Sequence, residues 1–292
     1  MSEMSQKRKG VFCMIFSAFS FSIMNLCVKL AGDLPAIEKS FFRNLVAVLV
    51  AFIMLKKSGG GFHVKKGNLP VLILRSVLGT IGIFANFYAI SHLVLPDATM
   101  LNKLSPFCTL LFSFLFLGEE LIPLQVAGIV IAFIGSAFII KPSFDLTATM
   151  PALIGAIGGI CAGGAYTCVR CLGKRGERGP MIVFFFSVFS CLAAVPFMIA
   201  DFHPITLSQF LILMGAGAGA AGGQFGITAA YRYAPAGEIS IYDYSTVFFA
   251  AIWGFLAFGE VPDGLSIVGY IMIFAMSLLM FLYNGRRAQA QD

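Results

Sequence analysis

The chain has 292 residues, of which 59% are hydrophobic and only 12% are charged. A soluble globular domain carries about 25% charged residues, so the composition excludes a water-soluble domain and predicts an all-α polytopic membrane protein. Lysine and arginine outnumber aspartate and glutamate by 20 to 14. In a membrane protein this excess bears on orientation in the bilayer, and we expect no nucleic-acid partner.

A hydrocarbon core of about 30 Å needs ~20 apolar residues of helix to cross it. Runs of about that size follow one another along the chain. We therefore expect ten transmembrane helices, at residues 10–31, 36–55, 69–91, 96–117, 123–140, 151–171, 181–200, 208–231, 237–258 and 264–283.

Basic residues in the loops predict the orientation. With a cytoplasmic N-terminus, only Lys39 and Lys141 fall outside. The cytoplasmic set is Lys7, Arg8, Lys9, Lys56, Lys57, Lys65, Lys66, Lys174, Arg175, Arg178, Arg232, Arg286 and Arg287. We expect a multi-pass protein of the cell (inner or plasma) membrane, with both tails, 1–9 and 284–292, in the cytoplasm. Lys29 and Arg170, near helix ends, are expected to anchor at the membrane interface.

The stretch 89–128 occurs twice, because a shift of 141 residues lays it without a gap on 230–269. Matching positions include Asp97 with Glu238, Thr99 with Ser240, Asn102 with Asp243, Gly118 with Gly259 and Glu119 with Glu260. We expect two homologous repeats, 10–140 and 151–283. Each holds five helices, an odd number, so the second must enter the membrane from the opposite side. Such inverted repeats (5+5) are typical of secondary transporters that work by alternating access.

Polar residues gather in the repeated stretch at helical spacing. They are Thr99, Asn102 and Lys103 in the fourth expected helix, and Ser240, Tyr242, Asp243 and Tyr244 in the ninth. Ionisable groups inside apolar helices usually face a cavity or a partner. We interpret them as a substrate-binding site, with Asp243 as the proton-coupling candidate. The alternative is an ion pair between Lys103 and Asp243 that only joins the two halves.

Other polar side chains lie inside expected helices and complete the candidate substrate-binding set. They are Arg75, Asn86, Tyr88 and Gln224. Arg43 has a similar position, facing the cavity or reaching the membrane interface. Pro106 is expected to kink the fourth helix, and glycines four residues apart in 155–163 and 215–223 are expected to allow close helix packing.

Gly118 and Gly259 are each expected to end a helix. The glutamates that follow, Glu119 and Glu260, are expected to cap the next helix. No hydrolase, metalloprotease or Walker A motif is present in the sequence, and the G-x-G-x-x-G at 217–222 lies inside an apolar helix with no strand before it, which excludes a dinucleotide site. We therefore expect no catalytic residues, no metal, no cofactor and no enzyme activity.

Several of these features together resemble the drug/metabolite transporter (DMT) superfamily, EamA-like family. They are Phe42-Arg43, Ala89, Pro96-Asp97-Ala98, Pro106-Phe107, the Gly-Glu pairs and their second copies. The resemblance implies a ten-helix carrier of small metabolites with a central cavity lined largely by its third, fourth, eighth and ninth helices. Phe41-Phe42-Arg43, Leu74-Arg75 and Tyr242-Asp243-Tyr244 also look like the sub-branch near S-adenosylmethionine carriers.

The sequence thus predicts a secondary active transporter of a small polar, amphoteric metabolite, coupled to protons or working by exchange. An amino acid, a nucleoside-like compound and an S-adenosylmethionine-like compound all fit a site that holds both charges. The alternatives are a broad-specificity drug/metabolite exporter and, less favoured by the motifs, an intramembrane lipid-modifying enzyme. The expected partners are the metabolite and the lipid bilayer, and the protein is expected to be a monomer or a homodimer.

Overall fold

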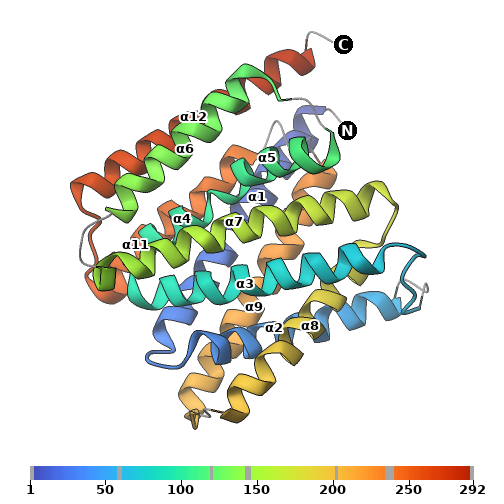
Figure 1. The fold of residues 1–292 in the computed structure, drawn as a ribbon, viewed down its shortest axis with the longest axis vertical. Helices are drawn as coiled ribbons and strands as arrows, with labels where there is room; N and C mark the ends of the chain where they lie inside the picture. The colour runs from blue at the N-terminus through green and yellow to red at the C-terminus, as the bar shows by residue number, and fades with distance from the viewer. Residues whose placement is uncertain are drawn as a thin grey trace.

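The computed structural model describes residues 3–57, 61–118, 121–141, 146–200, 203–233 and 240–289, and its regular elements there are all helices. In chain order (Figure 1) they are α1 (Glu3–Leu30), α2 (Ala36–Lys57), α3 (Leu69–His92), α4 (Leu95–Asn102), α5 (Ser105–Leu117), α6 (Pro123–Ile140), α7 (Leu146–Lys174), α8 (Gly179–Ala200), α9 (Leu207–Tyr233), the 3-10 helix η1 (Ser240–Tyr244), α11 (Ser245–Phe258) and α12 (Gly264–Gln289).

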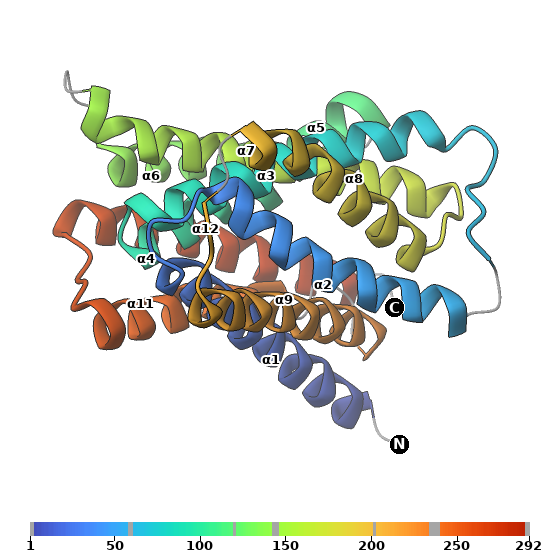
Figure 2. The ribbon, with the colours of Figure 1, turned by 90° about the horizontal axis from the view of Figure 1, so that it is seen from below.

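Helices from the first half of the chain pack mainly against helices from the second half. The most extensive contacts join α1 to α9, α3 to α7, α2 to α8 and α6 to α12. Figure 2 shows α1 and α9 on one side of the bundle and α3 and α7 on the other. The start of α1 and the end of α12 lie at the same end of the bundle (Figures 1 and 2). The two halves therefore form one body.

Eight helical segments of the described residues are long and apolar enough to cross a membrane, which makes this a multi-pass membrane protein. They correspond to eight of the ten expected helices. The expected helix at 36–55 is present as α2, but its first two turns carry Glu38, Lys39 and Arg43, all buried. The expected helix at 237–258 is described only from Ser240, and its α-helical part, α11, has 14 residues.

The fourth expected helix is interrupted in its middle. The segment Leu95–Leu117 consists of α4 and α5, separated at Lys103 and Leu104. Pro106 stands in the first turn of α5, where it cannot donate a hydrogen bond to the carbonyl one turn earlier. The predicted kink is therefore a break between two helices. In the second half, the 3-10 helix η1 precedes α11 at the matching place, so both copies of the repeated stretch depart from a continuous α-helix there.

Glycines of α7 bring this helix close to the break, as their spacing predicts. A Cβ atom on Gly159 would lie 2.6 Å from the carbonyl oxygen of Leu101, and one on Gly163 would lie 2.4 Å from the Cβ of Cys108. Both distances are shorter than carbon contacts allow. The absence of a side chain at these positions thus lets α7 support the backbone around the break.

Gly163→Ala is therefore expected to lower the stability of the protein by about 1–3 kcal/mol, since added volume in a packed interface forces helices apart. Gly173→Ala is the matched control, because no atom lies within 4 Å of a Cβ built on that glycine of the same helix. Thermal unfolding of both purified variants checks this. Equal melting temperatures would contradict the packing role of Gly163.

Glu177, in the loop between α7 and α8, ties together two loops at one end of the bundle. Its Oε2 atom accepts hydrogen bonds of 3.0 Å from the Nδ2 of Asn68 and of 3.0 Å from the backbone N–H of Lys65. Burial opposes its ionisation, but these bonds and a third from the N–H of Arg178 outweigh burial and hold the pKa of Glu177 below its usual range.

The lowered pKa of Glu177 predicts an acid-dependent loss of stability. A carboxyl with a depressed folded-state pKa adds stability above its unfolded pKa, about 4.3, and this stability disappears as the pH falls through the folded-state value. Glu177→Gln is expected to unfold more easily at pH 7 and to show a shallower further loss between about pH 5 and 3 than the unchanged protein. Melting curves across this range check the prediction, and parallel curves would contradict it.

Candidate substrate site

The break brings together two of the predicted residues, one from each half. The Nζ of Lys103 lies 2.5 Å from the Oδ2 of Asp243, and the side chains are 12% and 23% exposed. Both charges are thus largely withdrawn from the surface. The ion pair that the sequence offered as an alternative is present in the structure, and its geometry fits both a substrate site and a contact that only joins the two halves.

Helix ends lie close to both charges. Asp243 stands two residues before the start of α11, where N–H groups concentrate positive partial charge, so this helix end favours the carboxylate by about 0.3–1 kcal/mol. Lys103 stands between the end of α4, which favours a cation, and the start of α5, which opposes one, so the two helix ends largely offset each other at this residue.

Side chains around the pair fix its position. The Nζ of Lys103 also contacts the Oγ1 of Thr246 at 3.5 Å, and that hydroxyl donates to the backbone oxygen of Asp243 at 2.7 Å. The ring of Tyr244 lies 6.0 Å from the same Nζ, and its hydroxyl accepts a hydrogen bond of 2.5 Å from Ser277. Tyr242 is 38% exposed beside the pair and meets the edge of the Phe281 ring.

Polar groups continue from the pair along α4. Thr99 is buried, donates to the carbonyl of Leu95 at 2.8 Å and accepts a bond of 3.3 Å from the Nδ2 of Asn25 on α1. The Oδ1 of Asn25 is buried and has no hydrogen-bond partner in the described part of the chain. Asn102, the last residue of α4, is partly exposed and forms no side-chain hydrogen bond to any described residue. It therefore has free donor and acceptor groups next to Lys103.

The other predicted site residues do not contact this pair. Tyr88 stacks on His92 at the end of α3, with ring centroids 4.1 Å apart. Asn86 is buried where α3 meets Gly158 of α7, and Gln224 is exposed on α9. Arg75 lies in the first two turns of α3, with its guanidinium 3.7 Å above the Phe186 ring. The side chain of Ser240 lies outside the described residues.

The start of α4 is held by carboxylates, and here one expectation was wrong. Glu260 does not cap the helix that follows it in sequence. Its Oε2 accepts the N–H of Leu95 at 2.9 Å, at the start of α4, and its Oε1 pairs with Lys29. Lys29, in the last turn of α1, is thus held by an ion pair across the two halves. Asp97 accepts hydrogen bonds from Ser266 and Tyr270 of α12.

Gly259 ends α11 with a φ of 66° and Gly118 ends α5 with a φ of 64°, as predicted, while Glu119 lies outside the described residues.

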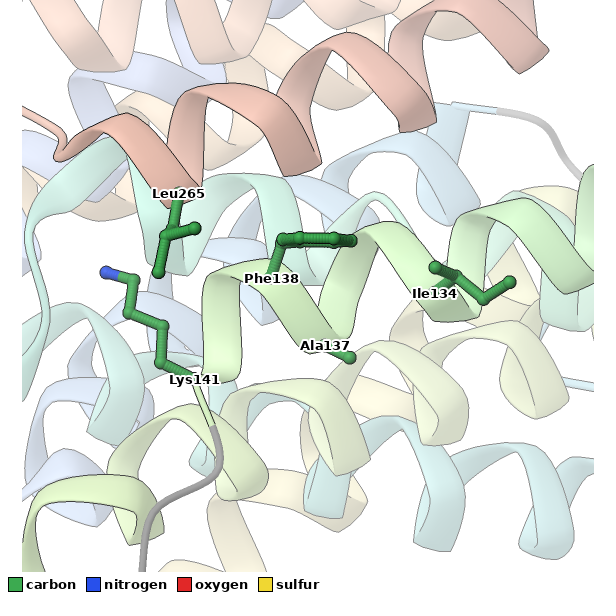
Figure 3. Close-up of a pocket in the computed structure, with 5 residues that line it drawn as sticks. All are labelled: Ile134, Ala137, Phe138, Lys141 and Leu265. Atoms are coloured by element: carbon green, nitrogen blue, oxygen red, sulfur yellow. The ribbon is translucent and has the colours of Figure 1, made fainter.

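An apolar groove at another place does not contribute to the site. It encloses about 310 Å³ between α6 and α12 and is lined by Ile134, Ala137, Phe138, Lys141 and Leu265 (Figure 3). Lys141 at its rim hydrogen-bonds Asp263, which holds the pKa of that loop carboxyl below its usual range. The groove is open, is lined by apolar side chains apart from Lys141 and lies away from the break, so it forms no part of the candidate site.

Sequence reasoning did not find Thr246, Asn25 or Ser277 as parts of this region. Single hydroxyl and amide side chains in apolar helices give no distinctive pattern. The repeat offered one signal for Thr246, because it matches Ser105, which stands directly after the break in the first half. A comparison of matching positions could therefore have identified it.

Comparisons with known proteins agree with this architecture. The model of the EamA-like transporter family matches twice, at residues 8–141 and 149–282. The Pseudopaline exporter CntI of Pseudomonas aeruginosa is 34% identical over 268 residues, which cover 91% of this chain and 93% of the exporter. Human Solute carrier family 35 member G1 is 29% identical over 92% of this chain and 78% of its own length.

A solved crystal structure supports the fold alone. It superposes with a TM-score of 0.66 over 95% of this chain and 98% of the other, at 16% identity. The predicted resemblance to the EamA-like family is confirmed, and the finer one to S-adenosylmethionine carriers stays a prediction. The double family match, the relatives and the helical architecture lead to one conclusion: this chain is a multi-pass membrane transporter and belongs to the EamA-like transporter family of the DMT superfamily.

Proposed function

We propose that the protein is a secondary active transporter that carries a small amphoteric metabolite across the cell membrane by alternating access. The observation that carries the proposal is the largely buried Lys103–Asp243 pair, at the place where helices of both repeats are interrupted. Transporters of inverted-repeat architecture place substrate at such interrupted helices. A substrate with one cationic and one anionic group can replace each partner of the pair in turn.

The helix contacts support two repeats, 10–140 and 151–283, related by a two-fold axis in the membrane plane. Under the 141-residue shift α1 matches α7 and α9 matches α3, so the contact between α1 and α9 is the counterpart of that between α7 and α3. The pairs α2–α8 and α6–α12 map onto themselves. Rocking of one repeat against the other around a central site is the movement that such symmetry permits.

The proposed site consists of Asn102, Lys103, Tyr242, Asp243 and Tyr244, with Thr246 added from the structure. Asp243 is the proton-coupling candidate, because it is the acid of the pair and keeps 23% of its side-chain surface exposed. A proton on Asp243 would release Lys103, and the free ammonium would attract the substrate carboxylate. Transport coupled in this way would respond to a pH gradient across the membrane.

Uptake into proteoliposomes tests the proposal. The name of the Pseudomonas relative makes export the direction to test first. The solute panel holds amino acids, nucleosides, S-adenosylmethionine and uncharged amphipathic drugs. We expect saturable transport and counterflow of one amphoteric class. Transport of unrelated drugs with no competition from amphoteric compounds would instead support a broad exporter, and conversion of a lipid by the purified protein would overturn the assignment as a carrier.

A further inference from the structure

Two arginines inside the bundle lack acidic partners. Arg43 on α2 is 7% exposed, donates through Nη1 to the Oδ1 of Asn44 at 2.6 Å and has an unpartnered, buried Nε. Arg75 on α3 has two buried and unpartnered nitrogens, Nε and Nη1. Among the described residues, no carboxylate forms an ion pair with either guanidinium. Several strong donors thus remain free in the membrane interior.

The two arginines are held at neighbouring turns of α8, Arg43 through Asn44 at Ser190 and Arg75 on the ring of Phe186. Arg43, Arg75 and the hydroxyl of Tyr166 on α7 lie within electrostatic range of one another, and Tyr166 is also in range of Asp243. Tyr166 stands on α7, which packs most extensively against α3, and 52% of its surface is exposed.

The surroundings hold both arginines in place. Asn44, which accepts the bond from Arg43, donates in turn to the Oγ of Ser190 on α8 at 2.8 Å. Arg75 lies flat on the Phe186 ring of α8. A Cβ atom on Gly79 would lie 2.7 Å from the Nη1 of Arg75 and 2.8 Å from the Phe186 ring, so this glycine leaves the room that both occupy. Such fixed guanidinium groups are ordered before any ligand binds.

Like charges that are close together in a membrane interior repel each other and are unfavourable unless an anion joins them. We propose that Arg43 and Arg75, with the hydroxyl of Tyr166, form a subsite for a carboxylate of the transported metabolite, beside the Lys103–Asp243 pair. The planar guanidinium fork matches a carboxylate. The inference rests on the proposed transport function and narrows its substrate to metabolites that carry a free carboxylate in addition to their amino group.

Melting temperatures of the full chain in nanodiscs test the subsite. The probes are L-glutamate, succinate and citrate, with succinamide and sodium chloride of equal ionic strength as references. At least one carboxylate should raise the melting temperature saturably, because binding stabilises the folded state. Arg43→Gln and Arg75→Gln should each weaken its apparent affinity about 10- to 100-fold, as expected when a charged hydrogen bond is lost. Arg175→Gln is the control, since Arg175 is exposed and donates to the loop carbonyl of Gly67.

The outcomes separate this subsite from the transport function. Arg75→Lys keeps the positive charge and loses the fork, so it should bind more weakly than the unchanged protein and more tightly than Arg75→Gln. This variant keeps the test usable should a glutamine variant fail to fold. A saturable response that persists in both glutamine variants would overturn the subsite, as would no saturable response to any carboxylate. In both of these cases the transport proposal still stands if the proteoliposome panel finds an amphoteric substrate whose transport depends on Asp243.

Discussion

Exchanging the charges of the central pair is expected to preserve the fold and abolish transport. In the double variant Lys103→Asp with Asp243→Lys, the ion pair can form again with its direction reversed. The positive charge at position 243 then stands at the start of α11, which costs about 0.3–1 kcal/mol. The protein should therefore insert and unfold almost as the unchanged protein does, while uptake should fall about 100-fold because the substrate meets the wrong charge at each contact.

The single variants complete this test. Asp243→Asn and Lys103→Met each leave one charge without its partner in a site that is only 12% to 23% exposed. Breaking a buried pair in this way costs up to about 3–5 kcal/mol, an upper bound for groups that keep some exposure. Both single variants should therefore lose stability as well as transport, and only the exchanged pair should separate these two properties.

Measured uptake in proteoliposomes and thermal unfolding of the same preparations decide between the two interpretations of the pair. If Lys103 and Asp243 only join the halves, the exchanged variant regains both stability and transport. An exchanged variant that keeps more than about a tenth of the uptake of the unchanged protein would exclude the pair as the substrate site. A loss of less than about tenfold is smaller than the loss of one charged hydrogen bond would cause. Tyr88→Phe is a control with unchanged charge, because Tyr88 lies in the last turns of α3, where it stacks on His92. This variant should keep both its stability and its uptake.

The membrane helices could be predicted from the sequence because each crossing needs a long apolar run, which is a local property. Helix α2 is the exception, because it forms at the expected residues although charged residues interrupt its apolar run. The charges of α2 are buried against other helices: Lys39 is fully buried and donates to the Oγ of Ser91 at 2.7 Å. A hydropathy window counts such charges as if lipid surrounded them. The partners that remove their cost come from distant parts of the chain and are invisible to a window of adjacent residues.

The candidate site was predictable in part for a similar reason. Lys103 and Asp243 are conspicuous because charges are rare in apolar helices. When the two repeats are aligned, Asp243 matches Asn102, the residue next to Lys103. Tyr166 and Arg43 gave weaker signals, since a tyrosine is common in such helices and an arginine near a helix end can reach the interface. Which charge meets which depends on how helices pack across the two halves. The contact between Lys29 and Glu260, residues far apart in sequence, shows this most clearly.

Glu260→Gln is expected to be among the most destabilising conservative substitutions in the chain, at about 3 kcal/mol. Glu260 of the second half pairs with Lys29 of α1 and accepts the N–H of Leu95 at the start of α4. Lys29 also donates to the carbonyl of Leu93 at 2.5 Å. A glutamine would turn an amide donor toward the Lys29 ammonium, and this cation, only 12% exposed, would lose its counter-ion.

Asp263→Asn is the matched control for this substitution. Asp263 stands in the same loop between α11 and α12 and pairs with Lys141, but their side chains are 55% and 32% exposed. Exposed pairs contribute about 0–1 kcal/mol, so the control should melt within a few degrees of the unchanged protein. Melting temperatures of the two variants, measured side by side, check the difference. Equal losses would show that the Lys29–Glu260 pair is no more stabilising than a surface pair.

The stability expected from Glu260 has a consequence for transport. The start of α4 is held by Glu260 and, through Asp97, by α12, whereas its end at Lys103 is held across the halves by the pair that we assign to substrate. A substrate that replaces this pair would free only that end of α4. Glu260→Gln should therefore lower stability and change the maximal transport rate while the apparent substrate affinity stays the same, and a changed affinity with an unchanged rate would contradict this arrangement.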